Sequence, residues 1–414
     1  MNAAAQHILH ALRTDAQGTC GQHHEFTLRS AFQPIVSLAH CRTVGYEALV
    51  RTTDSNGVAV APPALFDTVA DAAELVHLDR LCRAVHTHNF VRHARNDSWL
   101  FLNVHPIVSV NGRLYGSFFE ELLATVGLPP ERIVIEILEG DMLDDQQLTS
   151  AVSFYRERGC LVALDDFGIG HSNFGRIWQV KPHIVKLDRS TLIFARQDAT
   201  ARRVLPRLVK LLHEAGCIVL IEGIEDEYEA MLAMESDAEL AQGYYFARPA
   251  PVPTELDATS PTIHTLFDHY RDRKPQLPQD NHHAAHIRLL PAAAAAVAAS
   301  TTLHCPAVDR LLQLAQVERC YLIDHEGRQI GASRIAAGQR ANDPRFRPLE
   351  NASDAIWMRR SYWRRALHHF GEVQATRPYL SASSGALCVT LSISFGNREQ
   401  PTVLCLDLSH DDSQ

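Results

Sequence analysis

The chain has 414 residues, of which 46% are hydrophobic and 21% charged, and its formal net charge is −9. This length exceeds one ordinary core, and the composition is that of a globular protein rather than a disordered or fibrous one. The acidic balance argues against a duplex nucleic-acid binder, but it is compatible with a small anionic substrate held by local cations or metals.

From about residue 30 to residue 250, short apolar runs rich in β-branched residues alternate with longer amphipathic stretches. The expected strands are Val44–Leu49, Leu100–Val104, Ile133–Ile137, Leu161–Leu164, Ile184–Leu187, Ile218–Ile221 and Tyr244–Phe246. The expected helices between them include Leu65–Phe90, Phe118–Val126, Leu148–Arg158 and Arg202–Ala215. Strands that alternate with helices predict a parallel sheet, and this number of units favours an α/β fold closed as a modified (β/α)8 TIM-type barrel over residues 28–251, after an N-terminal extension of residues 1–27.

Residues 252–303 are rich in proline and include two expected helices, Thr262–Arg273 and the alanine run Ala292–Ala299. We interpret this stretch as a partly helical linker between domains. Its histidines, His282, His283 and His286, are expected to be solvated rather than to bind a metal.

Residues 304–414 are predicted to form a smaller α+β domain. The expected helices are Val308–Gln316 and Ala355–His368, and a hairpin is expected from Cys320–Asp324 and Gln329–Ala332. Three further strands are expected at Glu372–Thr376, Ala386–Ser394 and Thr402–Leu408.

The sequence favours a cytoplasmic protein with reduced thiols. The first residues, up to Asp15, lack a cationic start followed by an apolar core, and no apolar run approaches the roughly 20 residues that a membrane span requires. The nine cysteines include no close pair of the CxxC type, which favours free thiols over disulfides or a zinc site.

Polar residues recur at or just after the C-terminal ends of the predicted strands: Glu47, Asn103, Glu136, Asp165, Asp166, Lys186, Asp188, Glu222, Glu225 and Gln242. In a barrel of this type these strand ends open onto one face, so the side chains should meet in one bowl. Carboxylates in such numbers would repel one another, and bound divalent metal would neutralise them. Oxygen ligands without histidine or cysteine favour Mg²⁺, Mn²⁺ or Ca²⁺ over zinc.

Two features within this set point to phosphodiester chemistry. The neighbours Asp165 and Asp166 are placed to share or bridge two ions, the usual device for in-line attack on a phosphodiester. Lys186 lies in an apolar run, where a lysine needs a partner, and it can hold the attacking water or balance the phosphate charge. Each Asp or Glu alone could instead be a solvated loop residue, a helix cap or a turn former, whereas Lys186 is harder to dismiss. Their recurrence at successive strand ends favours one site.

These residues stand in motifs that resemble those of the EAL-domain cyclic-di-GMP phosphodiesterases. In order, the motifs are Phe32-Gln33-Pro34-Ile35-Val36, Tyr46-Glu47-Ala48-Leu49-Val50-Arg51, Asn103-Val104-His105-Pro106, Glu136-Ile137-Leu138-Glu139, Asp165-Asp166-Phe167-Gly168, Lys186-Leu187-Asp188, Glu222-Gly223-Ile224-Glu225 and Gln242-Gly243-Tyr244. The resemblance implies a homodimeric enzyme that hydrolyses cyclic-di-GMP to pGpG with Mg²⁺ or Mn²⁺ at a two-metal site and is inhibited by Ca²⁺.

The resemblance also implies a role for each matched residue. Glu47, Asn103, Glu136 and Asp165 match ligands of one metal, and Asp166 matches a ligand of the second. Glu222 matches a glutamate assigned as metal-associated or as general base, Lys186 matches the lysine that positions the nucleophilic water, and Gln242 matches a contact near that water. Gln33, Leu49, Arg51 and Asp188 match positions that line the substrate, and Glu139 matches the residue that anchors the loop after the aspartate pair.

Four positions depart from the family's common motifs, namely Leu138, Ile169, His171 and Ile221. None removes a metal ligand, so the departures bear on regulation and basal rate more than on the chemistry. A catalytically silent receptor for cyclic-di-GMP, a protein-interaction module and an enzyme for another dinucleotide stay open as alternatives.

The C-terminal unit resembles a PAS- or Cache-type sensor, through Tyr321-Leu322-Ile323-Asp324 and through Thr390-Leu391-Ser392. Such a module would regulate the barrel through a small ligand that the sequence does not identify. Arg360, Trp363, Arg377 and Tyr379 are candidate ligand contacts. The competing interpretation is that these aromatic residues pack the core and that the arginines pair with acids.

Overall fold

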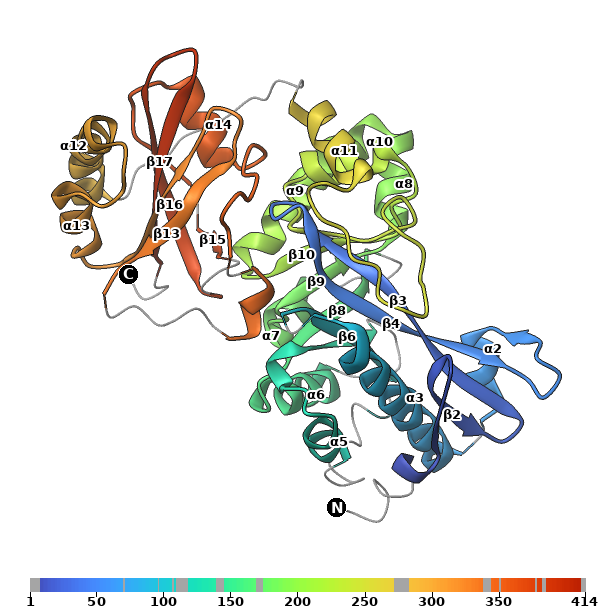
Figure 1. Ribbon diagram of the computed structural model, residues 1–414. Helices are drawn as coiled ribbons and strands as arrows, with labels where there is room; N and C mark the ends of the chain where they lie inside the picture. The colour runs from blue at the N-terminus through green and yellow to red at the C-terminus, as the bar shows by residue number, and fades with distance from the viewer. Residues whose placement is uncertain are drawn as a thin grey trace.

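The computed structural model describes residues 8–69, 71–95, 97–105, 108, 118–138, 145–168, 174–271, 283–337, 344–349, 351–376, 378–381 and 385–410. Two domains lie side by side, an N-terminal barrel and a C-terminal domain built on an antiparallel sheet (Figure 1). No helix in these ranges is both long enough and apolar enough to cross a membrane. All nine cysteines are buried, and none of them forms a disulfide in the structure.

Eight strands close the barrel. They are β3 (Phe26–Ser37), β4 (Arg42–Thr53), β6 (Trp99–Val104), β7 (Ile133–Leu138), β8 (Leu161–Phe167), β9 (Ile184–Leu187), β10 (Ile218–Ile221) and β11 (Leu240–Ala241). From β4 to β11 neighbouring strands pair in parallel, whereas β3 is antiparallel to both β4 and β11 and closes the ring between them. The prediction of a modified TIM-type barrel is therefore confirmed.

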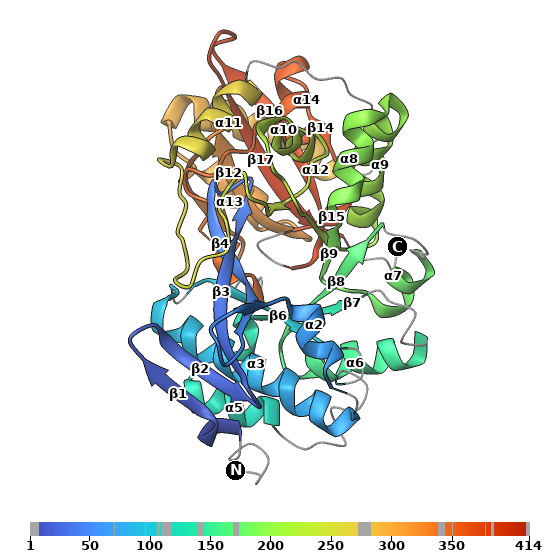
Figure 2. The same ribbon diagram turned by 90° about the vertical axis from the view of Figure 1, so that its right-hand side faces the viewer.

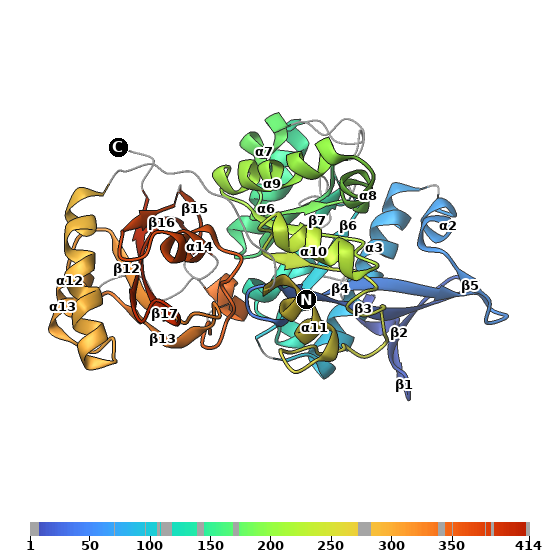
Figure 3. The same ribbon diagram turned by 90° about the horizontal axis from the view of Figure 1, so that it is seen from above.

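Helices surround the barrel, as Figures 2 and 3 show. They are α3 (Ala72–His93), α5 (Phe118–Val126), α6 (Asp145–Glu157), α7 (Phe174–Val180), α8 (Arg189–Gln197), α9 (Ala199–Glu214), α10 (Glu227–Glu235) and α11 (Pro261–Arg271). The short strands β1 (Leu12–Asp15) and β2 (Gly18–His23) continue the sheet from β3, and β5 (Ala59–Val60) pairs with β4 before helix α2 (Pro62–Asp67).

Three expectations for the barrel differ from the structure. Tyr244–Phe246 is a turn, in which the Phe246 amide donates to the Gly243 carbonyl, and the last strand is Leu240–Ala241 instead. The single helix expected over Leu65–Phe90 is two helices, because Asp71 accepts a hydrogen bond from the Glu74 amide and starts α3 afresh. Strand β3 was not expected, since Gln33 and Pro34 interrupt its apolar run.

The C-terminal domain is a six-stranded antiparallel sheet with helices on both faces. Its strands are β12 (Val317–Ile323), β13 (Gln329–Ile335), β14 (Gln374–Ala375), β15 (Tyr379–Leu380), β16 (Leu387–Gly396) and β17 (Pro401–Ser409). Alternate residues of β12 and β17 face α12 (Ala284–Ser300) and α13 (Pro306–Leu312) on one side and α14 (Ser361–His368) on the other. Helix α14 begins at Ser361, later than the expected start at Ala355, because residues up to Arg360 are turns and extended chain.

Much of the expected linker is packed against one domain or the other. Helix α11 buries Ile263, Leu266 and Phe267 in a barrel cluster, and α12 belongs to the core of the C-terminal sheet. His286 is buried and hydrogen bonded at 3.0 Å to the Ala315 carbonyl, so the expectation of a solvated linker histidine is wrong at this position. His282 lies outside the described residues.

The C-terminal domain contacts the end of the barrel at which the parallel strands begin. Phe346 and Leu349, in the 3-10 helix Pro344–Leu349, are buried in one cluster with barrel residues such as Ile35 and Val44. The Trp99 indole donates to the Arg345 carbonyl at 2.6 Å, and Ile356 donates to the Ala39 carbonyl at 2.7 Å. The predicted site lies at the opposite end of the barrel, where the parallel strands finish.

Candidate active site

Lys186 stands at the centre of the predicted bowl. It is near the end of β9, is 1% exposed and is surrounded by carboxylates from three other strand ends. Its Nζ lies 3.0 Å from Asp165 Oδ1 and 2.7 Å from Glu222 Oε1, and it also forms an ion pair with Glu136. The lysine in the apolar run therefore has partners, as its burial requires.

Glu47 organises the other half of the bowl. Its Oε1 accepts a hydrogen bond from Asn103 at 3.0 Å, and its Oε2 accepts one from Gln242 Nε2 at 2.7 Å. The same Gln242 nitrogen lies 3.2 Å from Gln33 Oε1. Glu47, Glu136 and Glu222 each bring one carboxylate oxygen to within 4.8 Å of the others. Residues from β3 to the end of β11 thus meet at one place.

The charges in this bowl do not balance. Among the described residues, Glu47, Glu136, Asp165 and Glu222 face one buried cation, Lys186. Burial raises the pKa of Glu222 to about 8 and raises that of Glu136 well above its usual range, in spite of the lysine. Burial alone would lower the pKa of Lys186, but Asp165 and the two glutamates outweigh it and raise that pKa, so the lysine stays protonated.

The donor set fits divalent metal ions of the Mg²⁺ and Mn²⁺ class. Both carboxylate oxygens of Glu136 are buried without a hydrogen-bond partner among the described residues, and they share the lysine with two other carboxylates. The ligands are oxygens, the charge is negative, and the cluster is buried, which is the environment that hard cations prefer. Glu47, Asn103, Glu136, Asp165 and Glu222 could hold such an ion.

The aspartate pair owes its position to an irregular strand end. The pairing of β8 with β9 shifts register between Leu164 and Phe167, and Asp166 has a φ of 56°, in the left-handed region. Adjacent residues of a regular strand face opposite sides, and this irregularity interrupts that alternation. Burial raises the pKa of Asp166 to about 6, and Asp165 adds to the effect.

Other predicted residues lie around this centre with less direct contacts. Asp188 caps α8 by accepting from the Ser190 amide at 2.7 Å. Leu49 and Arg51 follow Glu47 on the same face of β4, and the exposed Arg51 donates to the Val50 carbonyl. Glu225 is exposed and forms an ion pair with Arg189. Glu139, Ile169 and His171 lie outside the described residues.

The structure adds residues to which the sequence motifs assigned no role. A cavity of about 250 Å³ at the bowl is lined by Gln33, Glu47, Glu222 and Gln242, and also by Arg189 and Tyr244. Each of the last two stands one or two residues after a predicted site residue, Asp188 or Gln242, and that adjacency is the signal that could have found them. Gly243 also lines the cavity, and a Cβ there would lie 2.0 Å from the Ile224 carbonyl oxygen.

The C-terminal candidate contacts are occupied within the protein. Arg360 Nη2 donates to Glu239 at 3.0 Å, Trp363 donates to the Asp324 carbonyl at 3.0 Å, and the Tyr379 hydroxyl is 2.6 Å from that of Thr390. These contacts match the competing interpretation, in which aromatic residues pack the core and arginines pair with acids. Arg377 lies outside the described residues.

Comparison with known proteins gives a consistent result for the barrel. The family model described as "EAL domain" matches residues 17–249. Cyclic di-GMP phosphodiesterase RocR of Pseudomonas aeruginosa is 29% identical over 236 residues, which are 55% of this chain and 59% of RocR. YkuI of Bacillus subtilis, an EAL-domain protein, is 26% identical over 244 residues, or 58% of this chain and 59% of YkuI. The matched region therefore spans about three fifths of these relatives.

Solved structures show the same fold. The crystal structure of Bacillus subtilis YkuI with c-di-GMP and calcium has a TM-score of 0.53 at 21% identity and covers 93% of this chain and 96% of that one. This likeness concerns the fold alone, and it extends into the C-terminal domain. A standalone EAL protein from Vibrio cholerae O395 in its c-di-GMP bound form has a TM-score of 0.50 at 25% identity, and covers 57% of this chain and 98% of that one.

Proposed function

The chain belongs to the EAL domain family, and from this premise we propose that it is a phosphodiesterase that hydrolyses cyclic-di-GMP to pGpG. The observation that carries the proposal is the buried, unbalanced cluster of Glu47, Glu136, Asp165 and Glu222 around Lys186. The name of RocR and the bound nucleotide of the Vibrio cholerae structure support the choice of substrate.

Glu47, Asn103, Glu136 and Asp165 would hold one Mg²⁺ or Mn²⁺ ion, and Asp166 together with Asp165 would hold a second. Ions bound there would neutralise phosphate charge and lower the pKa of a water molecule. Ca²⁺ would fill the same ligands and inhibit. Glu222 assists these ligands or acts as the base, and its raised pKa of about 8 lies near the operating range of a general base.

The chain's own residues supply orientation and fixed charge. Lys186 is held protonated by its carboxylate neighbours, so it serves as a donor to the attacking water or to a phosphate oxygen rather than as a base. Water oxygen bonds to phosphorus as one P–O bond to the sugar breaks. The water proton passes to Glu222 in its carboxylate form, and the leaving oxygen takes up a proton from solvent. Gln242 orients Glu47 by donating to its carboxylate, and Gln33 accepts a hydrogen bond from the same Gln242 amide.

Residues at the rim would contact the nucleotide. Arg51 is exposed beyond Glu47 on β4, where its guanidinium can meet a phosphate oxygen in two hydrogen bonds. Gln33, Leu49 and Asp188 would line the substrate beside it. Glu139 would anchor the loop that follows Asp166.

The test is an assay of the full-length protein with cyclic-di-GMP and Mn²⁺, in which chromatography separates pGpG from substrate. We expect turnover in the wild type, its loss in Glu47→Gln and Lys186→Met, and its retention in Glu120→Gln, whose carboxylate pairs with Arg158 on the outside of the barrel. Nucleotide binding in Ca²⁺ without turnover in Mn²⁺ or Mg²⁺ would identify a silent receptor instead. Faster cleavage of another dinucleotide in competition would overturn the assigned substrate.

We further propose that the C-terminal domain is a PAS- or Cache-like module that regulates the barrel from its far end. Its contacts reach the starts of strands whose other ends carry site residues: Trp99 begins β6, which leads to Asn103. Glu239, the partner of Arg360, precedes β11, which leads to Gln242. A small movement of this domain would therefore be transmitted along short, stiff strands.

A crevice between the domains offers a place for the unknown regulatory ligand. It has a volume of about 440 Å³ and is lined by α9 residues such as Arg207 and by Arg360, Tyr362 and Tyr379 of the C-terminal domain. We also propose a homodimer. Light scattering at micromolar concentration checks this proposal, and a mass of one chain would contradict it.

A further inference from the structure

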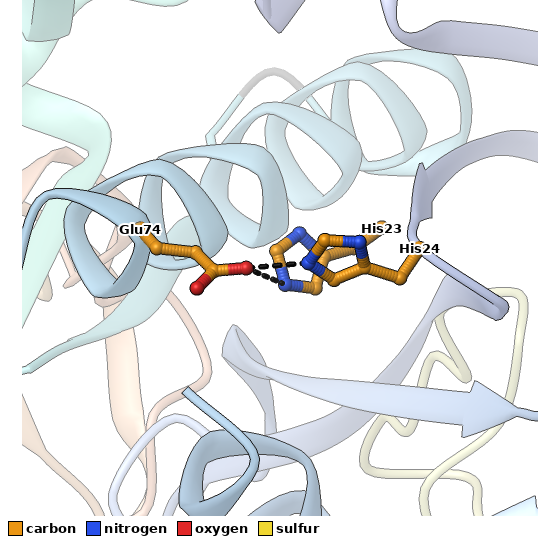
Figure 4. Close-up of side chains that lie close together, drawn as sticks. All are labelled: His23, His24 and Glu74. Carbon is orange, nitrogen blue, oxygen red and sulfur yellow. Dashed lines mark hydrogen bonds and ion pairs between the residues drawn. The ribbon is translucent and has the colours of Figure 1, made fainter. Parts of the chain in front are cut away.

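Two histidines and a glutamate meet on the outside of the barrel, apart from the carboxylate bowl. His23 ends β2, His24 begins the two-residue turn to β3, and Glu74 lies in the first turn of α3. Figure 4 shows the Glu74 carboxylate directed at both imidazole rings from the facing helix. We call these three residues the His23–His24–Glu74 cluster.

The backbone places the two rings on the same side. Neighbouring residues of a strand point to opposite faces, so His23 and His24 would diverge if β2 simply continued. Instead His24 has a φ of 49°, in the left-handed region, and its ring lies 4.5 Å from that of His23, centroid to centroid. A non-glycine residue in this region costs on the order of 1 kcal/mol or more, so the surroundings must hold it there.

The carboxylate of Glu74 is aimed at the same point. Asp71 caps α3 and makes Glu74 the third helical residue, a position from which a glutamate often reaches back to the cap amide. Here its Oε1 is hydrogen bonded to His24 Nε2 and lies 3.7 Å from His23 Nε2. Three donor atoms from two elements therefore lie within 4.8 Å of one another.

His23 gives the independent sign of a missing ligand. Its side chain is 5% exposed, and its Nε2 has no hydrogen-bond partner among the described residues. A neutral imidazole can offer a nitrogen lone pair to a cation, which is the form that metal ligands require.

We propose that the His23–His24–Glu74 cluster binds a transition-metal ion of the Zn²⁺ class through the Nε2 atoms of His23 and His24 and the carboxylate of Glu74. Zinc sites take histidine nitrogen and carboxylate oxygen at about 2.0–2.2 Å, so donors that already lie within 4.8 Å of one another need only small adjustments to surround an ion. Two imidazoles and one carboxylate also form a common zinc ligand set with one position left for water.

The ligand types separate this site from the bowl. Imidazole nitrogen favours zinc, nickel or copper, whereas the all-oxygen bowl favours magnesium or manganese. Ion binding would tie the β2–β3 hairpin to α3 and would stabilise the folded chain, because metal binds only the assembled site. His77, one turn after Glu74, has its ring centroid 6.1 Å from that of His23 and stands next to this site.

The test is calorimetric titration of ZnCl₂ into the full-length protein after treatment with a chelator. We expect the double variant His24→Gln/Glu74→Gln to bind one equivalent fewer than the wild type, and His93→Gln, on the exposed end of the same helix, to match the wild type. Since His24 is 63% exposed and Glu74 34% exposed, the double variant should fold, and circular dichroism checks this.

In the same experiment, Glu136→Gln distinguishes zinc bound at the cluster from zinc bound in the bowl. It should lose any zinc bound in the bowl but keep the equivalent at the cluster, and X-ray absorption of its one-to-one zinc adduct should show imidazole ligands. An unchanged stoichiometry in the double variant, or an adduct of Glu136→Gln without imidazole, would overturn this proposal and leave the proposed phosphodiesterase activity untouched.

Discussion

Two desolvated glutamates, the half-buried Glu222 in the bowl and the buried Glu239 at the domain interface, show pKa shifts in opposite directions. Glu222 shares one lysine with Glu136 and Asp165, and burial raises its pKa to about 8. Burial would raise the pKa of Glu239 as well, but His213 and Arg360 outweigh it and hold that pKa below its usual range. The number of cations for each carboxylate therefore decides the sign of the shift.

The opposite pKa shifts distinguish the bowl, which needs a bound cation, from the domain interface, where the carboxylate already has its partners. At the interface Glu239 Oε1 accepts from Arg360 at 3.0 Å, and its Oε2 accepts from the Val219 amide at 3.0 Å and contacts His213 at 2.9 Å. The charges in the bowl have no such balance, so added divalent cations should stabilise the bowl and leave the interface unaffected.

The largest expected effect follows from removing one charge of the bowl. Glu136→Gln should lower the rate of cyclic-di-GMP hydrolysis by about 10²–10³-fold or more, as the loss of one preorganised catalytic group does. The same variant should not lose stability in the absence of metal, because it relieves repulsion among buried carboxylates. Chromatographic assay of pGpG and thermal unfolding in a chelator measure the two effects, and a variant that is both active and unstable would contradict the comparison.

The interface should behave in the reverse way. Arg360→Ala should lower the free energy of unfolding by about 3–5 kcal/mol, because the buried Glu239 carboxylate loses the guanidinium that compensates its charge. Urea unfolding of Arg360→Ala, Glu239→Gln and the double variant measures the coupling between the two side chains. Arg364→Ala, in helix α14 directly after Arg360, serves as control, since the Arg364 guanidinium donates to the Tyr270 hydroxyl at 3.4 Å rather than to a carboxylate. A coupling free energy near zero would show that Arg360 and Glu239 do not stabilise each other, which would contradict the comparison.

Acid should weaken the interface at a second point. His40 lies 3.0 Å from the Leu349 carbonyl and 2.9 Å from the Ser37 hydroxyl, and burial, together with Arg42, lowers its pKa to about 3. Because the folded pKa is below the usual 6.5, the contribution of His40 to stability is complete above about pH 6.5 and is lost as the pH falls toward 3. The stability difference between wild type and His40→Gln should therefore shrink between pH 7 and pH 4 in urea unfolding, and a constant difference would refute this.

The smallest effect should come from an exposed pair. Arg334 lies 2.8 Å from Asp309, whose side chain is 50% exposed, and Arg334 also donates to the Leu303 carbonyl. Asp309→Asn should change the free energy of unfolding by less than about 1 kcal/mol, because water screens such pairs. A larger loss would show that burial is not what distinguishes the two clusters from the rest of the surface.

The barrel and the chemistry of the bowl could be predicted from the sequence, because strands and helices alternate along the chain and polar residues recur at the strand ends. Lys186 in an apolar run could be predicted to need partners, and the structure provides them in Asp165 and Glu222. Strand β3 was missed because Pro34 and Gln33 break its pattern, and Gln242 follows Leu240–Ala241 rather than the expected Tyr244–Phe246.

Contacts between domains could not be read from the chain. Glu239 looks like any acidic loop residue until the fold brings Arg360, 121 positions later, to its side. The His23–His24–Glu74 cluster was missed for the same reason, since a positive φ at His24 and the approach of α3 are both products of folding. Neither the positive φ nor the approach of the helix can be predicted from the spacing of residues in the sequence.

The measurement that tests the central claim most directly is calorimetric titration of MnCl₂ into the full-length protein, repeated in buffers with different ionisation enthalpies. With a pKa of about 8, Glu222 is largely protonated at pH 7 and must release its proton when a cation binds, so the affinity should rise from pH 6 to pH 8. The account predicts saturable binding with proton release in the wild type and its loss in Glu136→Gln. Absence of binding at millimolar Mn²⁺, or identical titrations of the two proteins, would contradict it.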